Sequence, residues 1–357
     1  MKLLRLTPAL KSTSSSYNQF SLGFKETIDQ TIGSLNKHEI LIDEKIAVFH
    51  GDGSALKMLK QIKKFIHKNR YDVIHIHNGA TGIIFIFAIF PFRLGLLKKT
   101  VFTLHNSWNV FKIRNQFLSL IVMLLSRKVC TCSQSSQESL PKIIKYFINK
   151  KTKAVVNGFD NERIDRVENK KLNGVHFDKS SKIKIVYIGE FNNIKNQIAF
   201  LEALNLTSIE AEVIFLGNAV NKKNLIEFSK KISNSIKIHF KGLVSRDLTI
   251  EHMLEADVYI SLSKGEGLPI AALEAMYAGC FMILSTIPPH KEISPPPERC
   301  FFVDINNKEE IIDSLHYVTN NLEKIKNKRQ ISKEYSVINF GVNSMLESYK
   351  KVYDSLY

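Results

Sequence analysis

The sequence of 357 residues has few cysteines and no long hydrophobic run. Its most apolar stretches, residues 83–90 and 117–125, are far shorter than the roughly 18 to 20 residues that a membrane-spanning helix needs. The opening MKLLRLTPALKS is interrupted by Pro8 too early for a signal peptide, and it is more typical of a first strand. These absences predict a cytosolic protein.

The four cysteines agree with that location. Cys130 and Cys132 are separated by one residue, a spacing that suits neither a disulfide scaffold nor a zinc knuckle. Cys280 and Cys300 stand alone, so all four are expected to be small buried residues.

Familiar cofactor and metal motifs are also missing. The sequence contains no G-x-G-x-x-G and no P-loop, which argues against a dinucleotide enzyme and an NTPase. His75 and His77 have a strand-face spacing but no evident third ligand, so a zinc site is not expected. We therefore expect neither a cofactor nor a metal.

Acidic residues are scarce in the first half of the chain. Residues 1–165 contain 25 Lys and Arg against 11 Asp and Glu, whereas residues 166–357 contain 25 against 23. This asymmetry suggests that the first half meets a polyanion. No nucleic-acid-binding signature is present, so an anionic membrane surface fits better, at about 1 kcal/mol per nearby basic residue. A merely lysine-rich, solvated surface stays open as the alternative.

Length and patterning predict an α/β protein of two domains, because one core rarely serves 357 residues. Short β-rich runs alternate with longer helical ones, as in parallel sheets. Strands are expected at 3–7, 40–42, 46–49, 72–76, 100–104, 128–132, 153–156, 182–189, 211–216, 236–240, 257–262, 281–284 and 300–303. Helices are expected near 17–36, 54–69, 80–90, 111–126, 134–148, 195–206, 221–232, 247–254, 269–278, 308–320 and 332–355.

The expected domains are residues 1–160 and 182–335. A polar stretch without periodicity, residues 161–181, is the expected linker, and residues 336–357 form a closing helix. Folds of this kind bind ligands at the carboxyl ends of their strands, so we expect a cleft there.

The stretch SKGEGLPIAALEAMYAGC at 263–280 follows an expected strand. Pro269 suits the first helical position, and Gly279 suits the stop after Ala278. The backbone N–H groups around Gly267 and Leu268 would then lie at the positive end of the helix dipole. That arrangement predicts an anion or phosphate site.

Two glutamates bracket this turn. Glu266 lies on it, whereas Glu274 falls among apolar i±3 and i±4 neighbours, where an ionised carboxylate is costly unless it is paired. A vicinal diol such as a ribose offers two donors to a carboxylate. A glutamate bonded to a nearby backbone turn is the structural alternative, but the pair in its Gly/Pro context favours ligand binding.

EGLPIAALEAMYAGC resembles the Glu–seven residues–Glu motif of family 4 retaining glycosyltransferases, which have the GT-B fold of two facing Rossmann-like domains. The resemblance covers nearly the whole chain. Further matching segments are YDVIHIHN, VFTLHN, VCTCSQSS, VVNGFD, IVYIGEFNNIKNQ, VIFLGN, IHFKG and ADVYISLS, in the expected order.

The resemblance implies roles for the two glutamates and their turn. Glu274 would bind the ribose of a nucleotide sugar, and Glu266 the hydroxyls of the sugar ring. The backbone at Gly267 and Leu268 would contact the sugar and the diphosphate. Lys195 would neutralise the diphosphate as it leaves.

The remaining implied roles lie on other strand ends. Residues around Gly217 and Leu243 would flank the nucleobase. His105, at the end of VFTLH, matches a family histidine that contacts the donor sugar near the reacting carbon. No Asp-x-Asp is present, which argues against a metal-dependent transferase of the other common fold.

The chain departs from the family pattern in three places. Glu190 follows the glycine matched by Gly189, where relatives usually have Arg, so Lys195 becomes the main cation of this donor-binding loop. The first loop, KSTSSSYN, replaces a Gly-Gly. Its Ser14, Ser15 and Ser16 either bind the acceptor or form an ordinary polar loop with a helix cap. Pro288-Pro289 replaces glycines and predicts a stiffer loop.

The hypothesis is a cytoplasmic, retaining, metal-independent hexosyltransferase, peripheral on the inner membrane. It would use a UDP- or GDP-sugar and a lipid-linked oligosaccharide in bacterial surface-polysaccharide synthesis, without nucleic acid. A sugar-nucleotide epimerase of the same fold and a non-catalytic scaffold that binds a partner enzyme are the alternatives.

Overall fold

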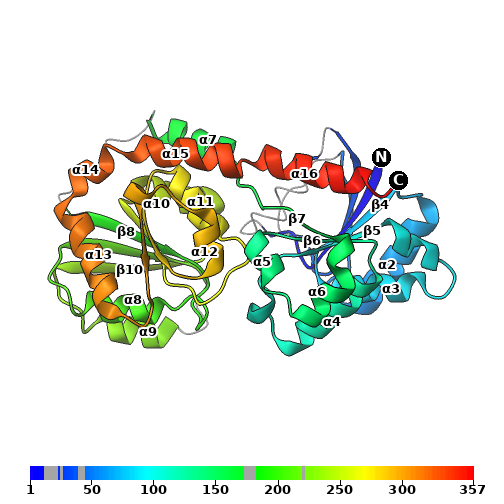
Figure 1. Cartoon of the computed structure of the whole chain (residues 1–357), viewed down its shortest axis with the longest axis horizontal. Coiled ribbons are helices and arrows are strands. Elements are labelled where there is room, and N and C mark those ends of the chain that lie inside the picture. The colour runs from blue at the N-terminus through cyan, green and yellow to red at the C-terminus, as the bar shows by residue number, and fades with distance from the viewer. Residues whose placement is uncertain (12–22, 25–26, 39–44, 173–181, 219–221) are drawn as a thin grey trace. The chain divides into compact units, whose positions relative to one another are not determined.

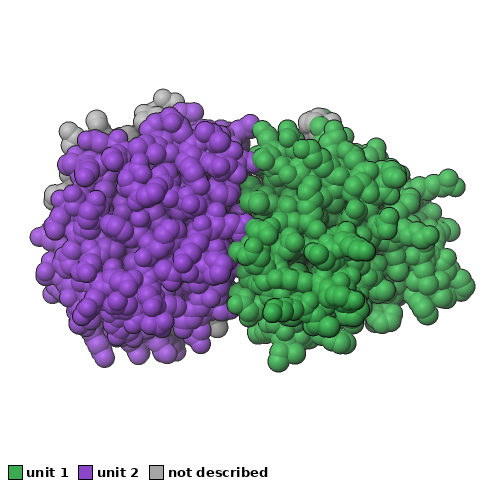
Figure 2. Space-filling view, viewed as in Figure 1, with its two compact units in different colours: residues 1–158, 342–357 green, residues 159–341 purple. Residues whose placement is uncertain are grey.

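The structure, a computed structural model, describes residues 1–11, 23–24, 27–38, 45–172, 182–218 and 222–357. These residues form two compact units, which Figure 2 distinguishes by colour. Unit 1 comprises residues 1–158 and 342–357, and unit 2 comprises residues 159–341. Each unit contains one parallel sheet with helices on both faces (Figure 1).

Unit 1 contains a seven-stranded sheet in the order β3-β2-β1-β4-β5-β6-β7. Its strands are β1 Lys2–Thr7, β2 Asp29–Ser34, β3 Ala47–His50, β4 Val73–Ile76, β5 Thr100–Leu104, β6 Lys128–Thr131 and β7 Thr152–Ala154. Its helices are α2 Ala55–Lys68, α3 Gly79–Ile89, α4 Ile113–Leu125, α5 Gln134–Glu138, α6 Lys142–Ile148 and α16 Val342–Asp354. Three short 3-10 helices are η1 Leu94–Lys99, η2 Trp108–Val110 and η3 Asn149–Lys151.

The inner strands β1, β4, β5 and β6 are buried on both faces, because helices cover each side of the sheet. Leu4 and Leu6 of β1 belong to a core with α2, α3, α4 and α6. Leu3, which points the other way, packs in a second core with Tyr349 and Tyr353 of α16. The alternation of β1 therefore places α16 on the face opposite α4 and α6.

Unit 2 contains a six-stranded sheet in the order β10-β9-β8-β11-β12-β13. Its strands are β8 Ile183–Ile188, β9 Ala211–Leu216, β10 Ile236–Gly242, β11 Val258–Ser261, β12 Phe281–Ser285 and β13 Cys300–Val303. Its helices are α7 Asn161–Leu172, α8 Gln197–Leu204, α9 Lys222–Ser229, α10 Arg246–Glu255, α11 Ile270–Tyr277, α12 Pro288–Ile293, α13 Lys308–Asn320, α14 Leu322–Lys326 and α15 Arg329–Phe340, with the 3-10 helix η4 Pro297–Arg299.

Two sequence predictions about boundaries differ from the structure. Residues 161–172 of the predicted linker form helix α7. This helix is held to α11 by the Tyr277 hydroxyl, which donates to the carboxylate of Asp165 on α7 at 2.7 Å. The predicted helix over 332–355 is two helices, because Gly341 is extended and pairs with Phe159. Helix α15 belongs to unit 2 and α16 to unit 1.

Two predicted helices of unit 1 are also wrong in part. The helix expected near 17–36 overlaps strand β2, which pairs in parallel with β1 and β3. Pro141 divides the helix expected at 134–148 into α5 and α6. The strand expected at 40–42 lies outside the described residues.

In the described parts of the chain, no helix combines the length and the apolar character that crossing a bilayer requires.

Candidate active site

The predicted donor-binding residues of unit 2 follow the carboxyl ends of neighbouring strands. Parallel strands end at the same edge of a sheet, so the loops after β8, β9, β10 and β11 are brought together there. These loops carry Gly189, Glu190, Lys195, Gly217, Leu243, Glu266, Gly267 and Leu268, and Glu274 follows in α11.

Gly189 and Gly217 allow two of these loops to touch. Their φ angles are +152° and +148°, and a Cβ on Gly217 would lie 1.9 Å from the carbonyl oxygen of Gly189. Any larger residue at position 217 would force the ends of β8 and β9 apart. The two glycines therefore keep this edge of the sheet compact.

Lys195 is positioned by its loop. The side chain of Asn192 accepts hydrogen bonds from the backbone N–H of Ile194 at 3.0 Å and of Lys195 at 2.9 Å. The buried Tyr187 hydroxyl donates to the carbonyl of Lys195 and accepts from the N–H of Leu262 at 2.9 Å. The loop after β8 is thereby tied to the strand that leads to Glu266.

Lys195 and Glu266 form an ion pair, with Nζ and Oε1 2.6 Å apart. Their side chains are 26% and 12% exposed, so water screens the pair only partly. Burial by itself would raise the pKa of Glu266, but Lys195 and the nearby His290 outweigh it and leave the pKa below its ordinary value. Glu266 is therefore a carboxylate at neutral pH.

Glu190 does not share this pair. Its side chain is exposed and accepts a hydrogen bond from Asn192 Nδ2 at 3.4 Å. The acid that replaces the family's usual arginine therefore leaves Lys195 bonded to Glu266.

Glu274 has a partner that the sequence reasoning missed. Its Oε1 forms an ion pair with Arg246, and both side chains are nearly inaccessible, at 3% and 11% exposed. Burial and then Arg163 lower the pKa of Arg246 to about 10, so this guanidinium is still charged at neutral pH. Glu274 Oε2 is buried without a hydrogen-bond partner among the described residues.

A signal for Arg246 did exist in the sequence. It follows Ser245, whose side chain caps α10 by accepting from the Leu248 N–H at 3.2 Å. Helix α10 follows β10, so its first residue lies near the carboxyl edge of the sheet. A cation there can neutralise the buried charge of Glu274.

The turn before α11 matches the prediction within one residue. Pro269 is the N-cap, with Ile270 as the first helical residue, and Gly279 has a φ of +86° beyond the last turn. Leu268 is buried, and Leu243 after β10 is 64% exposed. The prediction of an anion at this helix start, and the assignment of Leu243 to the nucleobase, stay predictions.

His290 is a second residue that was missed. Pro288 and Pro289 begin helix α12, which places the His290 Nδ1 2.9 Å from Ser285 Oγ and 3.1 Å from the Ser285 carbonyl. Burial lowers the pKa of His290 to about 4 despite the opposing effect of Glu266. The neutral ring donates through Nδ1, and its Nε2 has no partner among the described residues.

In unit 1, His105 follows β5, as predicted. Its Nε2 lies 3.0 Å from Nδ1 of His77, which follows β4. Burial and then Arg5 lower the pKa of His105 to about 3, so its imidazole is neutral at neutral pH. The spacing of His75 and His77 along their strand did not reveal this contact between His77 and His105.

A buried polar row extends from these rings to α16. His75 Nδ1 lies 2.7 Å from the Tyr353 hydroxyl, and His75 Nε2 lies 2.7 Å from Thr103 Oγ1. Burial and then the Arg5 charge lower the pKa of His75 well below its ordinary value. Helix α16 thus positions His75, whose ring packs against that of His77.

Ser14, Ser15 and Ser16 lie outside the described residues, so their predicted acceptor role is a prediction still. Within the described ranges, no group of three His, Cys, Asp or Glu side chains is arranged to hold a metal ion.

The fold and the matching sequence families identify the class of protein. The model for Glycosyltransferase Family 4 matches residues 36–163, and the model for Glycosyl transferases group 1 matches residues 168–336. The chain is therefore a glycosyltransferase of the GT-B fold. It belongs to the family 4, group 1 glycosyltransferases.

Relatives cover most of the chain. The Staphylococcus aureus capsular polysaccharide biosynthesis glycosyltransferase CapH is 25% identical over 304 residues, which are 82% of this chain and 79% of CapH. The Escherichia coli UDP-Gal:alpha-D-GlcNAc-diphosphoundecaprenol alpha-1,3-galactosyltransferase is 23% identical over 317 residues, 84% of this chain and 79% of its own length. In fold, the chain resembles Anabaena HepE in complex with UDP-glucose, with a TM-score of 0.77, 15% identity, and coverage of 99% of this chain and 100% of that chain.

Proposed function

We propose that the protein is a retaining hexosyltransferase of bacterial surface-polysaccharide synthesis. It transfers a hexose from a UDP- or GDP-sugar to a hydroxyl of a lipid-linked oligosaccharide. The observation that carries the proposal is the Lys195–Glu266 ion pair, which joins a cation for a diphosphate to a carboxylate for a sugar. Buried Glu274, in the next helix, supports it.

The ion pair suggests how the donor is received. The donor diphosphate competes with Glu266 for Lys195, because it carries more negative charge than one carboxylate. Glu266, released from the lysine, accepts hydrogen bonds from the sugar hydroxyls. Glu274 Oε2, which has no partner among the described residues, accepts from the ribose diol while Arg246 keeps Oε1.

The chemical step follows the family's front-face route. The bond between the sugar's anomeric carbon and the diphosphate breaks, and the acceptor oxygen bonds the same carbon on the same face. The acceptor's proton passes to the leaving diphosphate, whose growing charge Lys195 offsets. With a pKa of about 3, His105 contributes hydrogen bonds to the sugar rather than a proton. No metal takes part.

The proposed acceptor is supported by the name of one relative, and the proposed location by the distribution of charge. The name of the E. coli relative specifies a diphosphoundecaprenol-linked sugar as its acceptor. All of the net charge of +16 falls in unit 1, with 26 Lys and Arg against 10 Asp and Glu. Attraction to anionic lipid would hold the protein on the cytoplasmic face of the inner membrane.

Transfer assays with a panel of nucleotide sugars and a lipid-linked acceptor test the proposal. Glu266→Gln is expected to lower the transfer rate by about 100-fold or more, since Lys195 loses its counter-charge and the sugar loses a charged acceptor. Glu202→Gln is the matched control, since it removes a partly exposed carboxylate of α8 that pairs with Lys308 of α13.

NMR of the product gives the anomeric configuration. An inverted product would overturn the retaining mechanism, and a converted nucleotide sugar without transfer would indicate the epimerase. Full activity in Glu266→Gln, with the same unfolding midpoint as the parent protein, would remove Glu266 from the reaction.

A further inference from the structure

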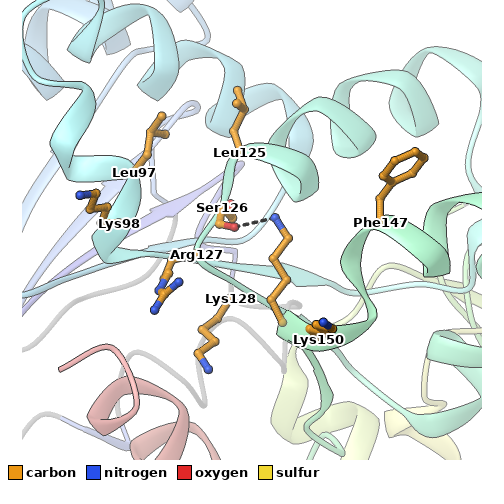
Figure 3. A pocket seen from close by; sticks show the side chains of 9 residues that line it. Leu97, Lys98, Leu125, Ser126, Arg127, Lys128, Phe147 and Lys150 are labelled. Carbon is orange, nitrogen blue, oxygen red and sulfur yellow. Dashed lines mark hydrogen bonds between the residues drawn. The ribbon is translucent and has the colours of Figure 1, made fainter.

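A cavity of about 530 Å³ opens in unit 1 between the end of α4 and the 3-10 helix η3 (Figure 3). We call it the amino-edge pocket. Its lining side chains are mostly cationic or apolar: Leu97, Lys98, Leu125, Ser126, Arg127, Lys128, Phe147, Lys150 and Lys151.

The pocket lies at the opposite edge of the unit 1 sheet from His105. Arg127 and Lys128 are at the start of β6, and Lys98 is one residue before the final residue of η1, just ahead of β5. His105 follows the other end of β5. Because the strands are parallel, the pocket belongs to the amino edge, away from His105.

Four cations of the pocket are available to a ligand. Among the described residues, Lys98, Arg127, Lys128 and Lys150 form no ion pair with an acidic side chain. Lys151 is used differently, since its Nζ donates to the carbonyls of Leu124 at 2.7 Å and Ser126 at 2.9 Å. The dashed line at Ser126 in Figure 3 marks the second of these bonds.

The surrounding sequence supplies almost no competing acid. Residues 73–159 contain 12 Lys and Arg and a single acidic residue, Glu138. A second cavity of about 300 Å³ shares Lys128, Lys150 and Lys151 with the pocket and adds Lys153 and Lys351. The positive potential therefore extends along this edge.

Large apolar side chains stand exposed on α4 and α6, the two helices that contribute Leu125 and Phe147 to the pocket. Phe147 is 63% exposed and lines the pocket, and Tyr146 beside it is 81% exposed. On α4, which packs against α6, Phe117 is 62% exposed and Leu124 is 45% exposed. Soluble monomers rarely leave such a group of large side chains uncovered.

This combination favours one kind of partner. A phosphate head group satisfies cations in a pocket, and the acyl boundary below it accepts aromatic and aliphatic side chains. Nucleic acid would satisfy the cations but would leave Phe117, Leu124 and Phe147 in water, on helices that present no basic groove of stacked aromatics.

We propose that the amino-edge pocket binds the phosphate head group of an anionic phospholipid while α4 and α6 press their exposed apolar side chains into the bilayer boundary. The proposal rests on the membrane partner of the proposed function and locates it on a surface distinct from the candidate active site.

Vesicle sedimentation tests this assignment on the full chain. Phosphatidylcholine vesicles, with and without phosphatidylglycerol, are compared at low and high salt. The variant Lys98→Gln/Arg127→Gln/Lys128→Gln/Lys150→Gln is expected to lower affinity for the anionic vesicles at least about tenfold. The control Lys60→Gln/Lys63→Gln/Lys64→Gln/Lys68→Gln removes the same charge from exposed positions of α2 and is expected to lower it less than about threefold.

A third variant separates the head group from the bilayer. Tyr146→Ser/Phe147→Ser keeps every cation, so we expect weaker vesicle binding with an unchanged salt dependence. Equal losses in the pocket variant and the α2 control, or binding that ignores phosphatidylglycerol, would overturn the pocket. If the pocket variant lost binding to a short RNA while the α2 control kept it, the pocket would be assigned to nucleic acid instead.

Catalysis is measured separately to distinguish this proposal from the proposed function. Transfer to a detergent-solubilised acceptor is expected to be unchanged in the pocket variant, whose four residues lie outside the candidate active site. If Glu266→Gln retains activity while the pocket variant still loses vesicle binding, only the proposed reaction fails.

Discussion

The two units share a parallel α/β architecture but handle charge in opposite ways. Unit 1 contains 26 Lys and Arg against 10 Asp and Glu, whereas unit 2 contains 24 of each. In unit 2 buried carboxylates are neutralised by Arg246 and Lys195. In unit 1 the buried histidines are neutral imidazoles beside one buried cation, Arg5, and the other described Lys and Arg side chains are not buried. In the functions proposed above, paired charges of one unit would receive an anionic donor, and the cations of the amino-edge pocket in the other would meet an anionic surface.

The largest expected effect comes from breaking the buried ion pair of unit 2. Arg246→Met would leave the Glu274 carboxylate buried and uncompensated, and we expect it to lower the free energy of unfolding by about 3 to 5 kcal/mol. Glu274→Gln in the same chain is expected to restore part of that loss, because the amide carries no charge. Urea unfolding followed by circular dichroism measures both.

An exposed ion pair of the same unit is the control. Arg163 pairs with Asp247 at 2.8 Å, with side chains 34% and 52% exposed, so Arg163→Met should cost less than about 1 kcal/mol. If Arg246→Met were equally mild, unit 2 would not depend on paired buried charge.

Acid is expected to destabilise unit 1 before unit 2. The folded pKa values of His75, His77 and His105 lie below the ordinary 6.5, so the unfolded chain binds more protons below that pH. Each buried imidazole therefore removes up to about 1.4 kcal/mol per pH unit as the pH falls below 6.5. Fluorescence of Trp108, the single tryptophan, follows unit 1.

Unit 2 has less to lose in the same range. His290, with a pKa of about 4, and the partly buried His252 oppose folding as the pH falls below 6.5. Glu266, whose pKa is lowered, keeps its stabilising effect above the ordinary 4.5 and loses it only below. His77→Gln should flatten the acid dependence of Trp108 fluorescence, and simultaneous loss of both units would contradict the difference.

The smallest expected effects test whether α7 is stabilised as part of unit 2 and α16 as part of unit 1. Tyr277→Phe removes a hydroxyl that donates to Asp165 on α7 at 2.7 Å, and Tyr353→Phe removes the one that meets His75 from α16. Each should cost about 1 kcal/mol. Amide hydrogen exchange should show that Tyr277→Phe lowers protection in unit 2 and that Tyr353→Phe lowers it in unit 1. The reverse result would contradict this assignment of α7 and α16 to the units.

Most strands were predictable because a buried parallel strand is a short run of β-branched and aromatic residues. Strand β2 was not, because its residues Gln30, Thr31, Gly33 and Ser34 are polar or small. Its place depends on distant partners. Phe49 covers Gly33 so closely that a Cβ there would lie 2.3 Å from the ring, and Tyr71 donates to Thr31 at 3.0 Å.

The candidate site divides in the same manner. Glu266 and Glu274 could be proposed from a local motif that carries both, Lys195 from the family resemblance of the loop after β8, and His105 from its place directly after β5. Arg246 and His77 were missed because each is defined by a contact across many residues, with Glu274 in one case and His105 in the other. Spacing along one element cannot report such contacts.

The return of the chain to unit 1 through α16 has a consequence for synthesis in the cell. Met345, Tyr349, Val352 and Tyr353 complete a core that contains Leu3 of the first strand. N-terminal domains usually fold first on the ribosome. Here unit 1 must wait, with one apolar face of its sheet uncovered, until α16 emerges, while unit 2 already has all of its residues. The half made first is the half finished last, and a chaperone that shields it during translation should matter more than one that acts after release.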